Sequence, residues 1–63
     1  MRFDDACDKL KPGTPVKIRR GGVLCKVKDI WIIHALESPT NHPVVLVYLD
    51  NGRKALHTEL QLV

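Results

Sequence analysis

Two different spacings of apolar residues divide the chain into a helical start and a longer segment of strands. Near the start, apolar residues recur at the spacing of one helix face, namely Phe3, Ala6, Cys7 and Leu10. The acidic pair Asp4–Asp5 lies where the helix dipole favours negative charge, and Lys11–Gly13 then interrupts the helix. The pattern predicts a short amphipathic helix within residues 1–11, followed by a small β-barrel domain over residues 12–63.

From Pro15 onward the period changes to two, which is typical of β-strands. Alternating runs flank Gly21–Gly22, and such a glycine pair predicts a β-hairpin closed by a two-residue turn. One face of this hairpin then collects Val16, Ile18, Val23, Cys25 and Val27. On the other face Lys17 stands directly opposite Lys26. Like charges in this position are slightly destabilising, which favours a nearby carboxylate or an acidic partner.

The second strand of this hairpin continues into the apolar run Ile30–Ile33. Strict alternation from Val27 would turn Asp29 toward the core, so we expect a β-bulge or a sharp bend near Asp29. The apolar run has apolar residues on both of its faces, and one face must point away from the core of a single small barrel. Residues 34–43 have the composition of a surface loop.

The C-terminal third predicts a second hairpin and a last short strand. Val44–Leu49 is apolar on both faces, and Asn51–Gly52 is a strong signal for a two-residue turn. This turn would place Ala55 and His57 on the outer face. A single helical turn over residues 58–60 and a strand over residues 61–63 complete the chain.

Five strands in so short a chain predict a mainly β fold. We expect a five-stranded SH3-like barrel or a curled antiparallel sheet with a short N-terminal helix, because open edges in a small sheet promote aggregation. The stretch Gly13-Thr14-Pro15-Val16-Lys17-Ile18-Arg19-Arg20-Gly21 resembles the opening of a KOW motif, with a glycine, alternating apolar residues and a glycine turn. A KOW unit places a further glycine in the second strand, where this chain has Cys25 or Lys26.

The resemblance to SH3-like barrels of the KOW and Tudor types implies a binding module. KOW units bind the ribosome or a polymerase, and Tudor barrels hold methylated side chains in an aromatic cage, for which this chain has few aromatic residues. The outline is also similar to that of the plasmid-borne type II dihydrofolate reductases, which build an active pore from small SH3-like barrels. Their Val-Gln-Ile-Tyr signature is replaced here by Val47-Tyr48-Leu49-Asp50.

Basic residues are concentrated in one part of the chain. The 63 residues include 10 Lys and Arg against 7 Asp and Glu, a formal net charge of +3, and no acidic residue lies between Lys9 and Lys28. The predicted hairpin carries a candidate nucleic-acid-binding face formed by Lys17, Arg19, Arg20, Lys26 and Lys28. Few aromatic residues accompany it, so we expect weak binding to the backbone of DNA or RNA. A solvated strand face is the alternative, because exposed charges interact weakly.

Apolar strand positions exceed what one small barrel can bury, which supports a second interpretation. The residues expected to remain exposed are Trp31, Ile32, Val44, Leu46 and Tyr48. Contiguous exposed apolar surface usually marks a partner site. On this interpretation the chain is a protein-interaction or self-assembling module, most simply a homodimer.

Other classes of function have little support in the sequence. The two cysteines and three histidines lack the close spacing of a zinc site, and secreted disulfide scaffolds usually have more cysteines. We therefore expect reduced thiols, no metal and no cofactor. A chain this short rarely encloses the water-poor pocket that acid–base catalysis needs, so we expect no enzyme, although an active site between subunits is an alternative.

The apolar runs are short. Neither Ile30–Ile33 nor Val44–Leu49 approaches the about 20 residues that a membrane-spanning helix needs. Met1–Asp5 does not lead into an apolar stretch as a secretion signal would. We therefore expect a cytoplasmic protein that makes no contact with membranes.

Overall fold

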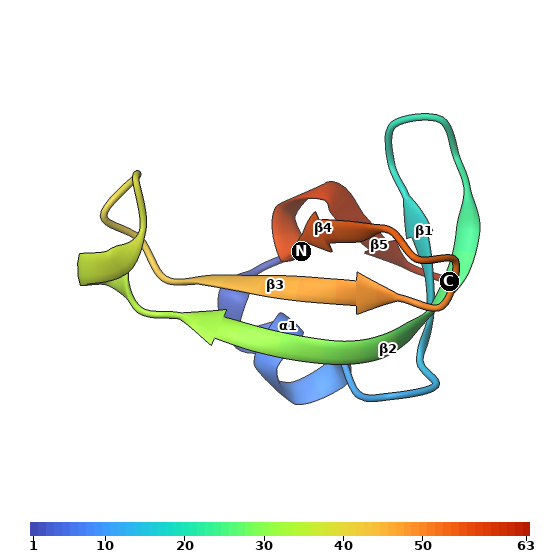
Figure 1. Cartoon of the computed structure of the whole chain (residues 1–63), viewed down its shortest axis with the longest axis horizontal. Coiled ribbons are helices and arrows are strands. Elements are labelled where there is room, and N and C mark those ends of the chain that lie inside the picture. The colour runs from blue at the N-terminus through green and yellow to red at the C-terminus, as the bar shows by residue number, and fades with distance from the viewer.

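The computed structural model covers residues 1–63 and shows a curled antiparallel sheet with a short helix at its start (Figure 1). The elements in chain order are α1 (Phe3–Lys9), β1 (Pro15–Ile18), β2 (Leu24–Ile33), the 3₁₀ helix η1 (Ala35–Glu37), β3 (Val44–Leu49), β4 (Lys54–Leu56), the 3₁₀ helix η2 (His57–Glu59) and β5 (Leu60–Leu62). The predicted helix, the two hairpins and the final strand after a helical turn are all present. No helix has the length and apolar character needed to span a membrane.

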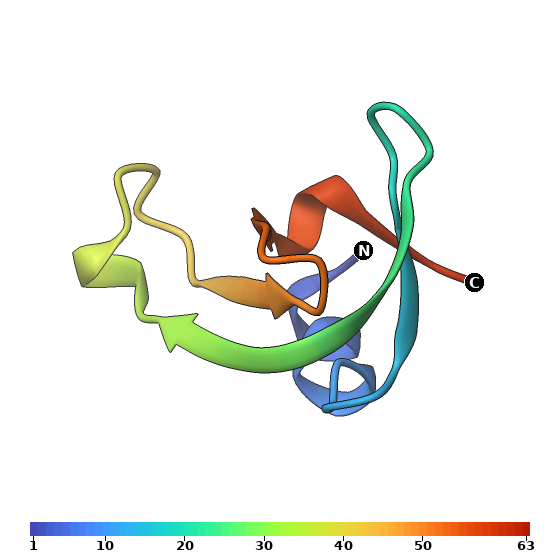
Figure 2. The same ribbon diagram turned by 45° about the vertical axis from the view of Figure 1, so that its right-hand side comes forward.

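The strands follow the order β4-β3-β2-β1-β5, and each neighbouring pair is antiparallel. β4 and β5 form the two edges and are not paired with each other, so the sheet is not a closed barrel. Of the two predicted architectures, the structure has the curled sheet. Figure 2 shows how the curl arises: β2 begins beside β1 and then bends away to run beside β3.

The bend in β2 contains a β-bulge at Lys28. Val27 pairs with Leu49 and Asp29 pairs with Tyr48, which leaves Lys28 between them without a partner on β3. The predicted irregularity near Asp29 is therefore confirmed. The extra residue changes the alternation of β2, so that Asp29 stays exposed instead of following Val27 into the core.

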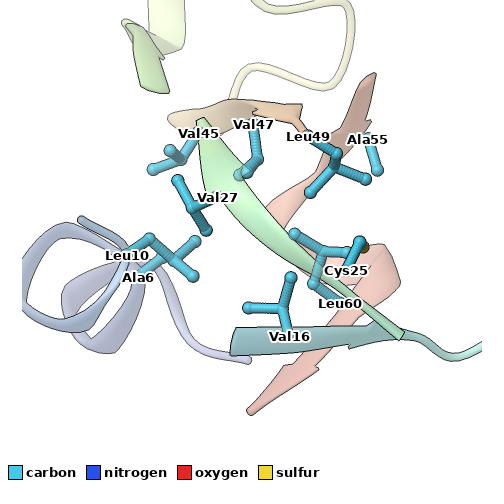
Figure 3. Close-up of a cluster of buried hydrophobic side chains, with 10 residues drawn as sticks. All are labelled: Ala6, Leu10, Val16, Cys25, Val27, Val45, Val47, Leu49, Ala55 and Leu60. Carbon is cyan, nitrogen blue, oxygen red and sulfur yellow. The ribbon is translucent and has the colours of Figure 1, made fainter. Parts of the chain in front are cut away.

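The core lies on the inner face of the sheet, and α1 closes one side of it (Figure 3). It consists of ten buried residues, namely Ala6, Leu10, Val16, Cys25, Val27, Val45, Val47, Leu49, Ala55 and Leu60. Ala6 and Leu10 are completely buried, as the helical spacing of the apolar residues predicts. Full burial of a leucine or valine side chain stabilises a fold by about 1.5–3 kcal/mol, so Leu10 makes the segment around α1 part of the stable fold.

The first hairpin has a longer loop than predicted. Lys17 pairs with Leu24 instead of Lys26, so the prediction that the two lysines stand directly opposite each other is wrong. Residues 19–22 form the loop, within which Gly21–Gly22 has the positive φ angles of 89° and 67°. The register differs from the prediction by two residues, which keeps the paired residues of β1 and β2 on their predicted faces.

A contact on the other side of β1 explains this longer loop. The backbone N–H of Arg19 donates to the carbonyl of Glu59 at 3.0 Å, and the N–H of Gly22 donates to the carbonyl of Ile18 at 3.0 Å. Arg19 thus bonds to η2 instead of to β2. The β1–β2 ladder therefore ends at Ile18, whose N–H donates to the carbonyl of Val23 at 2.9 Å.

The second hairpin also differs from the prediction, by one residue. Its loop is Asp50–Gly52, with the last residue at a φ of +83°, as three-residue hairpin loops require. Val47 therefore pairs with Ala55 instead of Leu56. A slip of one residue reverses the two faces of a strand. The prediction that Ala55 and His57 face outward is consequently wrong, because both are buried.

Candidate functional site

The residues predicted to bind nucleic acid lie along the β1–β2 hairpin and its loop. We call this surface the basic hairpin; its members are Lys17, Arg19, Arg20, Lys26 and Lys28. Lys17 and Lys26 share the outer face of the hairpin, because Lys17 pairs with Leu24 and Lys26 lies two residues further along β2. Lys28 is the bulge residue, and the two arginines occupy the loop, which projects from the rest of the sheet in Figures 1 and 2.

The true register changes the relation between the two lysines of the outer face. Lys17 and Lys26 are diagonal neighbours on the same face, at a backbone separation of about 7 Å. Leu24 lies beside Lys17 on this face and is 68% exposed. The diagonal arrangement spaces the two ammonium groups without the cost of direct opposition. It also leaves both of them available to an anionic ligand.

The side chains near the loop of the basic hairpin extend in two directions. Lys17 is half-buried, and its Cε would lie 3.8 Å from a Cβ placed on Gly22, so its stem runs along the glycine loop. Arg19 instead lines an open hollow of about 260 Å³ together with Asp5 and Lys9 of α1. The structure therefore gathers the lysines on one face and turns Arg19 toward the side of β5 and α1.

Carboxylates near the basic hairpin are few. Asp50 is the closest along the sheet: its Oδ1 accepts the backbone N–H of Lys26 at 3.1 Å, and its own N–H donates to the carbonyl of Lys26 at 3.0 Å. Asp29 accepts the N–H of Ile30 at 2.8 Å through its Oδ1. Glu37 lies in η1, at the end of the molecule opposite the β1–β2 hairpin in Figure 1. Asp50 therefore offsets charge near Lys26, and Asp5 shares the hollow that Arg19 lines.

The apolar residues predicted as an interface do not all share one face. Trp31 pairs with Leu46, and these two residues face outward together with Val44 and Tyr48. Ile32 pairs with the buried Val45 and therefore belongs to the inner face, although 41% of it is exposed. Of the two alternatives left open for the apolar run of β2, the outward one is Trp31 with Ile33.

A buried histidine is the main feature that the sequence interpretation placed wrongly. His57 is only 4% exposed, and its Nδ1 accepts the backbone N–H of Val45 at 3.1 Å. Phe3 contacts the ring edge-on, with 5.9 Å between centroids. Burial lowers the pKa of His57, and the nearby N-terminal ammonium lowers it further. The neutral ring therefore joins α1, β3 and η2 as a structural part of the fold.

An open hollow of about 570 Å³ lies beside this histidine. Its lining includes His57 and His42, with Arg2 and Asp4 from the start of the chain. No three His, Cys, Asp or Glu side chains gather where they could hold a metal ion. Because Nδ1 of His57 is already bonded to the backbone, the ring stands here as a packed side chain with one nitrogen committed to β3.

Both cysteines are free thiols. Cys25 belongs to the core, and burial raises the pKa of its thiol; the charge of Asp50 adds to this shift and that of Arg53 opposes it. A buried thiol with a raised pKa is a poor nucleophile. Cys25 therefore acts as a small apolar residue of β2.

No family model, no curated protein and no solved structure matches this chain. The resemblance to SH3-like barrels, which was inferred from residues 13–21 and the predicted strands, stays a prediction. Function has to be inferred from the two outward surfaces, namely the basic hairpin and the apolar side chains of β2, β3 and β4.

Proposed function

We propose that this protein is a small, non-enzymatic binding module of the SH3-like type, which holds the backbone of a nucleic acid against its basic hairpin. One observation carries the proposal: Lys17 and Lys26 share the outer face of one hairpin, with Lys28 at the adjoining bulge. The sequence between Lys9 and Lys28 contains no acidic residue that would repel a phosphate. Clustered lysines and arginines attract a phosphate backbone by releasing its condensed counterions.

The residues around the basic hairpin favour contacts to phosphate over contacts to bases. Lysine and arginine contacts to phosphates position a protein on nucleic acid without selecting a sequence. The exposed aromatic residues Trp31 and Tyr48 lie beyond the bulge, on the other half of the sheet, and neither belongs to the basic hairpin. Gln61, which pairs with Lys17, is the one amide on the same face. We therefore propose weak binding with little preference for sequence, to DNA or RNA.

The salt dependence of binding tests this proposal. Three to four phosphate contacts give a slope of about −3 in a plot of log affinity against log salt concentration on duplex DNA, and loss of one contact reduces that slope by about one. We expect this behaviour in anisotropy titrations of labelled duplex DNA and single-stranded RNA at low protein concentration. Lys17→Ala and Lys26→Ala should each weaken binding and flatten the slope.

Lys54→Ala is the matched control, because it removes the same charge from β4 on the other half of the sheet. It should leave the slope unchanged. The proposal fails if no binding occurs at low salt. It also fails if the double variant at Lys17 and Lys26 binds with unchanged affinity and slope, because the basic hairpin would then be only a solvated surface.

A further inference from the structure

The outer face of β2, β3 and β4 is an ordered array of side chains. Directly paired residues of neighbouring strands form three rows across this face, namely Asp29–Tyr48–Lys54, Trp31–Leu46–Leu56 and Ile33–Val44. These rows face outward because the alternate residues of β3 and β4, Val45, Val47 and Ala55, are buried in the core. We call the six apolar or aromatic members the outer apolar face: Trp31, Ile33, Val44, Leu46, Tyr48 and Leu56.

The chain itself leaves this face without a partner. Trp31 is 65% exposed and Tyr48 is 40% exposed. The one α-helix packs on the opposite side of the sheet, where Ala6 and Leu10 join the core. Trp31 and Tyr48 are the two exposed members, and the other four are half-buried. Exposed apolar side chains that lie together on a sheet face mark a partner site more often than scattered ones do.

We propose that the occupant is a second copy of this chain, packed face to face about a two-fold axis parallel to β3. The charges at the ends of the first row carry this inference. Asp29 lies on β2 and Lys54 on β4, at opposite sides of the face. A two-fold axis along the central strand exchanges the two sides, so that Asp29 of each copy lies opposite Lys54 of the other.

The same two-fold rotation also brings the apolar rows of the two copies together. Trp31 of one copy meets Leu56 of the other, and Leu46 meets its own equivalent, since it lies on the central strand. Two ion pairs thus border an apolar centre, as in the usual arrangement of a polar rim around a buried core. Sheets that pack with their strands nearly aligned are a common arrangement in β proteins.

The charge pattern of the rows favours a second copy over a nucleic acid or an unrelated protein. Asp29 and Lys54 give the rows no net charge, so the outer apolar face has no electrostatic attraction for a nucleic-acid backbone. An unrelated protein would need complementary charges of its own, whereas a second copy supplies them by symmetry. The inference is independent of the basic hairpin, because none of its members belongs to these rows.

The size of the face sets the strength of the association. Three strands about 4.8 Å apart and about five residues long, at 3.3 Å per residue, give a footprint of roughly 14 by 17 Å. This is well below the roughly 800 Å² per partner of a standard interface. We therefore expect a weak dimer, with a dissociation constant on the order of 100 µM, because the face is smaller than a standard interface.

Charge-reversal variants test the geometry by sedimentation equilibrium at concentrations on both sides of that constant. Asp29→Lys places two lysines opposite each other at each end of the row, and Lys54→Asp places two aspartates there. Each variant alone should lose association by about tenfold or more, as expected for opposed like charges. A mixture of the two variants should associate at the wild-type strength, because every facing pair is then of opposite charge. The double variant should also self-associate.

These outcomes remain informative if a variant is less stable. Asp29→Lys also removes the hydrogen bond to the N–H of Ile30, so folding is checked by circular dichroism. Recovery in the mixture does not restore that bond, and it therefore reports the facing charges alone. Glu37→Lys reverses an exposed charge in η1, away from these rows, and should leave the dimer unchanged. A monomeric wild type at all concentrations, or single variants that associate as well as the wild type, would overturn the proposal.

Discussion

Mild acidification should destabilise this fold through His57. The ring is buried and its Nδ1 accepts the N–H of Val45 at 3.1 Å, which requires an unprotonated nitrogen. Burial and the N-terminal ammonium lower the pKa of His57 in the folded chain. In the unfolded chain the side chain titrates near its ordinary value of about 6.5. The unfolded chain therefore binds a proton at a pH where the folded chain does not.

The direction and the limit of the effect follow from this difference. The stabilisation by neutral His57 is complete above about pH 6.5 and is lost as the pH falls below that value, until the folded chain also binds the proton at its lowered pKa. One proton changes the free energy of unfolding by at most about 1.4 kcal/mol per pH unit. Loss of the acceptor for a buried N–H, which costs about 1–3 kcal/mol, is contained in this change and does not add to it. Small domains have only about 3–5 kcal/mol in total, so the change is measurable.

Urea unfolding between about pH 7.5 and pH 5.5 measures this loss, a range over which carboxylates remain ionised. Far-UV circular dichroism is the suitable signal, because Trp31 is already exposed in the folded chain and its fluorescence will change little. His57→Asn offers an amide oxygen near the place of Nδ1 and does not titrate. It loses the contact with Phe3, so it should be less stable than the wild type at neutral pH, and it should lose little more on acidification.

His42→Asn is the matched control, because His42 lines the same hollow but is exposed and leaves the bond to Val45 intact. Its unfolding should keep the pH dependence of the wild type. A wild-type midpoint that does not change over this pH range would refute the reasoning. So would a His57→Asn variant that is destabilised by acid as steeply as the wild type.

Two further substitutions test the core and the first loop. Leu10→Ala should lower the free energy of unfolding by about 2–5 kcal/mol, because Leu10 is completely buried. Leu36→Ala, at a leucine that is 98% exposed, should change it by no more than about 0.5 kcal/mol, and equal effects would contradict the packing of the N-terminal segment. Gly22→Val should destabilise by about 1 kcal/mol or more at a φ of +67°, whereas Gly22→Asn should cost less, because asparagine tolerates this conformation. An unchanged melting temperature for Gly22→Val would be evidence against the loop.

Alternation along the chain was sufficient to predict the strands but not the length of the turns. Val44–Leu49 forms a strand over the predicted range. The tripeptide Asp50–Gly52 is compatible with both a two-residue and a three-residue loop, and the two choices differ by the slip that exchanges the faces of β4. The observed register buries Ala55 and His57 and places Leu56 beside Leu46 on the outer face. This selection depends on tertiary packing, which no short stretch of sequence contains.

Long-range contacts also limit how well the candidate site follows from sequence. The lysines of the hairpin keep their predicted face because the register shift was two residues, an even number. Arg19 leaves that face because its backbone bonds to Glu59, a residue far away in the chain. The sequence also did not predict which face of the sheet Trp31 lies on. That face depends on where β2 gains its extra residue opposite β3.

The extra residue at Lys28 explains how β2 contributes side chains to both the basic hairpin and the outer apolar face. Before the bulge, Lys26 faces outward, and strict alternation would then have carried Asp29 and Trp31 into the core. An ionised carboxylate is costly to bury without a partner, so the bulge both protects Asp29 from burial and presents Trp31 to the outside. The strand bends between a first half that carries Lys26 beside β1 and a second half that carries Trp31 beside β3 (Figure 2). Substitutions at the lysines of one surface therefore leave the other surface intact.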